Sequence, residues 1–141
     1  MLFINYSKKI VNKFVYRQVE LVREDGYTVG EFSIDGKGYD NYIESLNSGN
    51  TCSMTISLDD EYENRGLEKM MFQTMIANIR EEYPSIRGDQ LLFVDADASV
   101  GFWDKVGMKL NRYAEGYHRE MEGSGYEKVI TFQELEHYST V

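Results

Sequence analysis

Apolar and polar residues alternate from Cys52 to Leu58, so that every second side chain is apolar. A period of two is typical of a β-strand with one buried face. From Leu67 onwards apolar residues recur every three to four positions, which predicts an amphipathic helix. This helix should end near Tyr83, because Pro84 disfavours helical geometry in the residue before it. The methionines of the helix that we expect to fill the core are Met70, Met71 and Met75.

Weaker patterns on both sides predict further elements. Residues 14–22 and 27–34 should pair as a β-hairpin across the turn Glu24-Asp25-Gly26. Leu91 to Val94 is an apolar run of buried-strand length. The other predicted elements are a helical turn at 41–46, a helix at 99–106, strands at 108–113 and 126–132, and a final helical turn at 133–138. This order of strands, helix, strand, helix and strands predicts an α/β (α+β) fold.

Length and composition limit the class of protein. The 141 residues suit one domain over 1–141, with 42% hydrophobic and 28% charged residues. Because no apolar run approaches the roughly 20 residues that cross a bilayer, we expect no membrane association. Cys52 is the only cysteine, and no secretion signal is recognisable at the start, so we expect a cytoplasmic protein. The net charge of -9 argues against nucleic acid as a partner. An acidic surface favours either cationic partners such as amines or solubility alone.

The junction between the central strand and helix is the strongest candidate for chemistry. The N-terminus of a helix presents unpaired N–H groups and partial positive charge, which favour a phosphate group. Gly66 would allow a ligand to approach the backbone closely, and Arg65 could add a charge-assisted hydrogen bond. The chain has neither a Walker pattern nor a dinucleotide-binding glycine pattern. No residues have the spacing of metal ligands, so no metal is expected.

Two segments resemble the signatures of one family. The stretch LDDEYENRGLEKMM, from Leu58 to Met71, is similar to the acyl-CoA-binding motif of the GNAT superfamily of N-acetyltransferases. Downstream, ASVGFWDKVGM, from Ala98 to Met108, is similar to the second signature of that family. Both occur in the expected order, separated by a helix and a strand, and together they cover about the middle 50 residues.

The resemblance implies a GNAT-like fold with a central mixed, mostly antiparallel sheet flanked by helices. It also implies a shortened N-terminal region, because no clear pair of amphipathic helices precedes the central strand. The implied cosubstrate is acetyl-CoA, whose acetyl group is transferred directly to an amine, either a small molecule or a lysine side chain. A homodimer stays open as the assembly. The implied cofactor-binding residues are Ser57, Leu58, Glu63, Asn64, Arg65, Gly66, Leu67, Glu68, Lys69, Phe102, Trp103 and Lys105.

Transfer to an amine also requires a base and an acid. Glu31 is the candidate base, since it lies on the strand expected beside the central strand. Tyr113 is the candidate acid toward the departing thiolate, with Tyr117 as the alternative, because Trp103 stands where many members of the family have a tyrosine.

A second hypothesis is a GNAT-like domain that serves as a binding or scaffolding module with weak or no CoA binding. It is favoured by Glu63 and Glu68, which stand where the family usually has Gln or Arg and Gly or Ala, and by Trp103.

Overall fold

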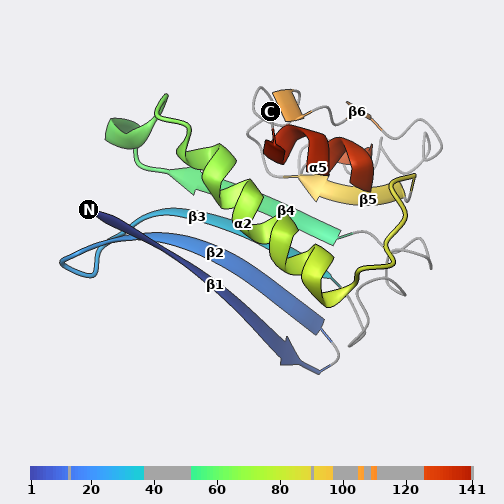
Figure 1. Ribbon diagram of the computed structural model, residues 1–141, viewed down its shortest axis with the longest axis horizontal. Helices are drawn as coiled ribbons and strands as arrows, with labels where there is room; N and C mark the ends of the chain where they lie inside the picture. The colour runs from blue at the N-terminus through green and yellow to red at the C-terminus, as the bar shows by residue number, and fades with distance from the viewer. Residues whose placement is uncertain are drawn as a thin grey trace.

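The computed structural model describes residues 1–12, 14–36, 52–89, 91–96, 105–106, 109–110 and 126–140. Within these residues seven strands form one sheet in the order β1-β2-β3-β4-β5-β7-β6 (Figure 1). The strands are β1 (Leu2–Val11), β2 (Phe14–Arg23), β3 (Thr28–Gly36), β4 (Cys52–Leu58), β5 (Leu91–Ala96), β6 (Lys109–Leu110) and β7 (Tyr126–Thr131). The helices are the short 3-10 helix η1 (Asp60–Tyr62), α2 (Leu67–Glu82) and α5 (Phe132–Thr140).

The sheet is mixed but mostly antiparallel, as predicted. Only β4 and β5 run parallel to each other, while the other neighbouring strands are antiparallel. The predicted hairpin is confirmed as β2 and β3, and its turn is closed by the hydrogen bond that Arg23 N donates to Tyr27 O. The parallel connection from β4 to β5 runs through α2, which is the usual way to join parallel strands. This crossover places the junction between β4 and α2 at the carboxyl end of β4.

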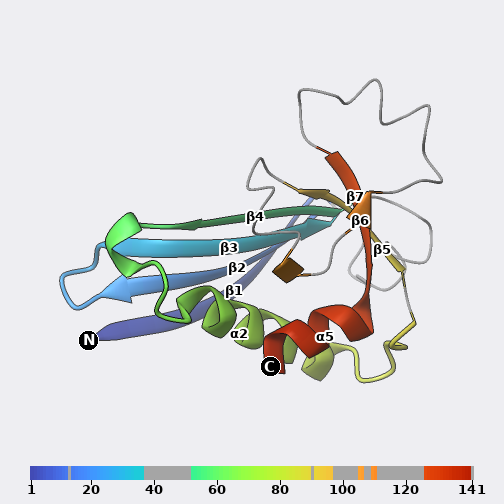
Figure 2. The same ribbon diagram turned by 90° about the horizontal axis from the view of Figure 1, so that it is seen from above.

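Alternation along the strands separates two faces of the sheet. On β2 and β3 the side chains of Val19, Leu21, Phe32 and Ile34 are buried, whereas Glu31 between them is exposed. Seen from above, α2 and α5 lie side by side on the same face of the sheet (Figure 2). The described helices therefore cover one face, and the alternate residues of β1 to β4 form the opposite face.

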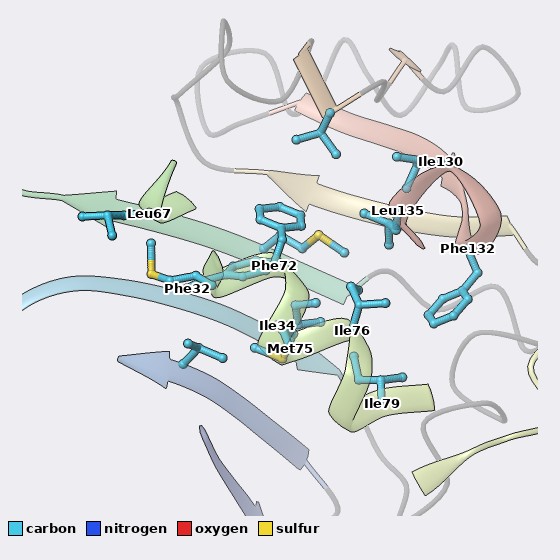
Figure 3. Close-up of a cluster of buried hydrophobic side chains, with 14 of the residues drawn as sticks. Phe32, Ile34, Leu67, Phe72, Met75, Ile76, Ile79, Ile130, Phe132 and Leu135 are labelled. Carbon is cyan, nitrogen blue, oxygen red and sulfur yellow. The ribbon is translucent and has the colours of Figure 1, made fainter. Parts of the chain in front are cut away.

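The core fills the space between α2 and the sheet. Phe72 of α2 stacks on Phe32 of β3, with ring centroids 4.2 Å apart (Figure 3). Tyr138 of α5 packs on Phe72 in a T-shaped arrangement, with ring centroids 5.0 Å apart. The buried residues of α2 are Leu67, Met71, Phe72, Met75, Ile76 and Ile79. The prediction for Met71 and Met75 is confirmed, but the prediction for Met70 is wrong, because its side chain is 43% exposed. Met70 therefore lies outside the buried face of the helix.

The last helix packs antiparallel against α2. Phe132 and Leu135 of α5 are buried, and Arg80 of α2 forms an ion pair with Glu136 of α5. Arg80 also donates hydrogen bonds to the carbonyl oxygens of Pro84 and Ile86, in the segment between α2 and β5. One guanidinium thus links α2, α5 and this segment. None of the described helices is long and apolar enough to cross a bilayer.

The N-terminal part differs from the sequence-based picture. We predicted no element before residue 14, yet β1 covers Leu2 to Val11 and pairs with β2 along its whole length. Val11 lies opposite Phe14, so the two strands are joined by a tight connection with no helix between them. This agrees with the shortened N-terminal region that we expected. The predicted helical turn at 41–46, residues 99–104 of the predicted helix, and residues 108 and 111–113 of the predicted strand lie outside the described residues.

Candidate functional site

The junction between β4 and α2 is a short, tightly held turn. Asp59 N donates a hydrogen bond to Val29 O of β3 at 2.8 Å, which fixes the end of β4, and η1 follows at once. Gly66 then begins α2 in a left-handed conformation with φ of 74°. Its backbone is open, since a Cβ at this position would meet no atom within 4 Å. No side chain caps α2 at Gly66, so the first N–H groups of the helix have no capping acceptor there.

The carboxyl-terminal half of β4 has one open edge within the described residues. β5 pairs only with residues 52–54 of β4, while β3 pairs with β4 as far as Leu58. Successive residues of a strand direct their N–H and C=O groups to opposite edges. Because Asp59 N–H bonds to β3, Ser57 also faces β3, and the N–H group of Leu58 faces the side of β5. A donor thus lies on this edge beside the start of α2.

Gly30 explains how Leu58 comes so close to its neighbour strand. It lies opposite Leu58 in the sheet, and a Cβ on Gly30 would stand 2.9 Å from the Cδ1 atom of Leu58. Only a glycine leaves room for this leucine in its present position. Gly30 therefore leaves space for the end of the Leu58 side chain.

The predicted residues of the turn divide between two sides of the α2 N-terminus. Glu63, Asn64 and Arg65 are all exposed, and Arg65 lies over the ring of Tyr62 at 5.4 Å. Arg65 lines a cavity of about 450 Å³ that is otherwise formed mainly by the β2–β3 hairpin and the start of β1. Its guanidinium is thus directed toward the hairpin, on the side away from α5.

Lys69 lies on the opposite side, in a larger cavity. We call this cavity of about 610 Å³ the α2–α5 pocket; its lining residues are Lys69, Lys105, Val106, Gln133, Glu134, His137 and Tyr138. The pocket brings together two residues that the sequence assigned to cofactor binding, Lys69 and Lys105. The contribution of α5 was missed, although Gln133 and His137 stand four positions apart and therefore share one helix face.

Tyr138 is the aromatic residue of this pocket. The Lys69 ammonium lies over its ring at 5.4 Å from the centroid. Burial raises the pKa of the Tyr138 hydroxyl, and the carboxylate of Glu68 nearby raises this pKa further. Glu68, which we predicted to bind the cofactor, thus has its charge close to Tyr138, while Leu67 is buried in the core.

Glu31 lies where the sequence placed it, on the strand beside β4. It is opposite Ser57 of β4 and opposite Glu20 of β2, and all three belong to the face of the sheet away from α2. The strands of a sheet are about 4.8 Å apart, so Glu31 is one strand spacing from β4. Three other predicted residues, Phe102, Trp103 and Tyr113, lie outside the described residues.

Comparison with known structures identifies the fold. The complex of KacTA with DNA has a TM-score of 0.53 at 15% identity, with 86% of this chain and 71% of that chain covered. A tyrosine-to-phenylalanine variant of KacT has a TM-score of 0.52 at 12% identity, with 86% and 74% covered. The chain therefore has a GNAT-like fold.

A third structure is of a candidate acetyltransferase from Exiguobacterium sp. 255-15, with a TM-score of 0.47 at 8% identity. The alignment covers 86% of this chain and 66% of that protein, so the chain spans just under two thirds of its length. No protein-family model matches the sequence, and no curated protein matches it significantly.

One sequence-based prediction is overturned by these comparisons. From the net charge of -9 we expected no nucleic acid as a partner, yet KacTA, which shares this fold, is seen in a complex with DNA. The inference failed because net charge sums over the whole surface, whereas contact with nucleic acid depends on the local arrangement of Lys and Arg. Charge alone does not exclude this class of partner.

Proposed function

We propose that the protein is an acyl-CoA-dependent N-acetyltransferase that transfers an acetyl group to an amine. The observation that carries this proposal is the junction of β4 and α2 within a GNAT-like fold. There the open strand edge at Leu58 lies beside a helix N-terminus that no side chain caps. An extended, phosphorylated thioester suits this combination of edge donors and helix N–H groups.

The residues of the site fit acetyl-CoA, which would supply an activated acyl group. The open backbone at Gly66 and the N–H groups of Leu67 and Glu68 would hold the pyrophosphate. Lys69 and Lys105 would add positive charge from the α2–α5 pocket. The domain over residues 1–141 would then contain one cofactor site. The acceptor would be a small amine or a lysine side chain.

Leu58 and Glu31 would act on the reacting groups. The Leu58 N–H would donate a hydrogen bond to the acyl carbonyl oxygen, which stabilises the charge that develops there. The amine must lose a proton to attack, and Glu31 would accept this proton, directly or through a water molecule. As the new C–N bond forms and the C–S bond breaks, Tyr113 would donate a proton to the leaving sulfur.

The experiment is a thiol-release assay with acetyl-CoA and a panel of polyamines, aminoglycosides and basic peptides. At least one acceptor should release thiol above the rate of hydrolysis. Glu31→Gln should lower kcat by roughly 100-fold, the usual loss for a general base. Glu20→Gln is the matched control, because Glu20 lies opposite Glu31 on the same face and should change kcat little. Thiol traces that stay flat over the whole panel would refute the enzyme proposal.

The second candidate is a GNAT-like binding or scaffolding module. It is favoured by the carboxylates of Glu63 and Glu68, which flank the start of α2 and oppose an anionic ligand. Glu68→Gly distinguishes the two functions. Under the enzyme proposal, Glu68→Gly should tighten the binding of acetyl-CoA. If the protein is a module that does not use CoA, neither the wild-type chain nor Glu68→Gly should show a thermal shift at millimolar acetyl-CoA.

A further inference from the structure

The strand β1 forms one edge of the sheet and carries exposed apolar side chains. It is the first strand in the sheet order, and no strand pairs with its outer edge within the described residues (Figure 1). Three of its apolar side chains are exposed, Phe3 by 49%, Ile10 by 45% and Val11 by 40%. A long strand edge with exposed apolar side chains is a template for pairing with another strand. β1 therefore has the properties of an interface.

These side chains are divided between the two faces of the sheet. Asn5 of β1 lies opposite Glu20 of β2, so the odd-numbered residues of β1, with Phe3 and Val11 among them, lie on the face away from α2. The even-numbered residues lie on the face of the core. Ile4 packs against the core but is only half-buried, and Ile10 on the same face is exposed. The core is therefore open to solvent at the edge that β1 forms.

A second copy of β1 fits this edge in an antiparallel arrangement. Opposing residues of an antiparallel pair lie on the same face, so the two-fold axis between two copies must pass through a residue. With the axis at Ser7, Phe3 lies opposite Val11 and Ile4 lies opposite Ile10. Exposed apolar residues are thus matched on both faces. Residues 3–11 of each copy would pair and form roughly eight to ten backbone hydrogen bonds.

The registers on either side of this one are less favourable. With the axis one residue later, Lys8 would lie opposite its own copy, and like charges directly opposite each other destabilise a strand pair. With the axis one residue earlier, Lys9 would lie opposite Phe3, so a charge would replace an apolar partner. The sequence of β1 therefore favours the axis at Ser7.

Charges on the face of the core complement each other about this axis. Within one chain, the Glu82 carboxylate of α2 accepts hydrogen bonds from the Tyr6 hydroxyl and from the Lys8 ammonium, both at 3.3 Å. With the axis at Ser7, Tyr6 lies directly opposite Lys8 of the second copy. Each Glu82 then comes near the Lys8 ammonium of the second copy as well. Opposite charges thus meet at this edge, although the chain is acidic overall.

A cavity on the other face lies where the second copy would place an aromatic ring. The cavity has a volume of about 400 Å³, and its lining residues on β1 and β2 are Ser7, Lys9, Val11, Tyr16 and Gln18. With the axis at Ser7, Phe3 of the second copy lies opposite Val11, at the border of this cavity. An aromatic side chain that enters it would bury apolar surface of both copies.

We propose that the chain forms a homodimer in which the β1 strands of two copies pair antiparallel about a two-fold axis at Ser7. The two sheets then join into one continuous sheet, and both exposed edges of β1 are removed from solvent. In the sheet order β4 lies three strands away from β1, so the dimer leaves the β4–α2 junction open. The dimer is independent of the proposed function, because β1 contributes no residue to the proposed cofactor site.

Sedimentation equilibrium of the full chain tests the assembly. The wild-type chain should form dimers whose share increases with concentration. Ser7→Lys should weaken the dimer by about 5-fold, because it places two lysines directly opposite each other at the axis. Thr55→Lys is the matched control, since Thr55 is exposed on the same face but lies on β4. It should leave the dissociation constant unchanged.

Cysteine cross-linking tests the register independently of the lysine variants. Cys52→Ser removes the only natural cysteine. In this background Ser7→Cys should form a disulfide-linked dimer on mild oxidation, because directly opposite residues have Cα atoms about 4.5 to 5.5 Å apart, within the range of a disulfide. Thr55→Cys should stay uncrosslinked. A wild-type chain that remains monomeric at millimolar concentration, a dimer that Ser7→Lys leaves unchanged, or cross-linking at Thr55 but not at Ser7 would overturn the proposal.

Discussion

Gly66 shows how one residue sets both the start of a helix and the space before it. Its φ of 74° lies in the left-handed region, which costs a residue with a side chain roughly 1 to 2 kcal/mol. The position therefore favours glycine for conformation, and the open space around it is available to a ligand. A second glycine, Gly26 in the β2–β3 turn, has a φ of 90° and equally open surroundings.

These two glycines allow a matched comparison. Gly66→Ala and Gly26→Ala should each lower stability by about 1 to 2 kcal/mol, because both place alanine in the left-handed region. Only Gly66→Ala should reduce the increase in Tm that CoA causes, since its methyl group enters the ligand space. Differential scanning fluorimetry with and without CoA measures both effects. Equal CoA-induced shifts in the two variants would show that Gly66 does not border the ligand.

The turn residues were predicted with uneven success at this scale. The sequence predicted the junction between β4 and α2, and it placed Glu31 on the strand beside β4. These predictions succeeded because strand alternation and helix periodicity extend over many residues. It did not predict that Arg65 would turn toward the hairpin and Lys69 toward α5. Arg65 precedes α2 whereas Lys69 lies in its first turn, and only the tertiary packing shows which neighbour each side chain meets.

At the scale of elements, the end of α2 is tied to the first two strands. Arg17 of β2 is fully buried, and its Nη2 atom lies 2.6 Å from Oε2 of Glu82, which also pairs with Lys8 of β1 at 3.3 Å. Burial by itself would raise the pKa of the Glu82 carboxyl, but the hydrogen bond and charge of Arg17, with the help of Lys8, hold this pKa below its ordinary value. Arg17 and Glu82 thus connect the helix to the sheet at the end away from the site.

We expect Glu82→Gln to destabilise the protein at pH 7 by about 1 to 2 kcal/mol, below the roughly 3 to 5 kcal/mol of a fully buried pair because solvent screens Glu82. Since the folded-state pKa is lowered, the ionised carboxylate stabilises the fold above its ordinary pKa of 4.5. The difference from wild type should shrink as the pH falls below that value. Urea denaturation at pH 7 and at lower pH measures it, with the exposed neighbour variant Glu81→Gln as control. A difference that stays constant with pH would contradict the role of the ion pair.

The order of elements from β2 to β5 could be predicted, whereas β1 could not. The first residues of β1 alternate between half-buried and exposed, but the apolar residues Phe3, Ile10 and Val11 are exposed. The apolar pattern of β1 in the sequence is therefore too weak to predict a strand. A strand at the edge of a sheet buries less than a central strand and so constrains its sequence less. Only a helical turn at 133–138 was predicted where α5 lies, and the packing of α5 against α2 depends on pairs such as Arg80 and Glu136 that are 56 positions apart.

At the scale of the whole molecule, the two faces of the sheet differ in what they carry. The face beneath α2 and α5 holds the core, and Glu31 and Ser57 lie on the other face at the end of β4. The open edge at Leu58 and the start of α2 lie at this same end. A thioester bound along the edge would thus be within reach of an acceptor approaching over the face that carries Glu31.

The most direct test of this account is backbone amide NMR of the 141-residue chain during titration with CoA. The account predicts that the amide signals of Leu58 and of residues 66–69 shift first and most, in one saturable binding event. Signals of the hairpin turn at Gly26 should stay in place. Absence of any shift at millimolar CoA, or shifts confined to residues away from the β4–α2 junction, would contradict the central claim.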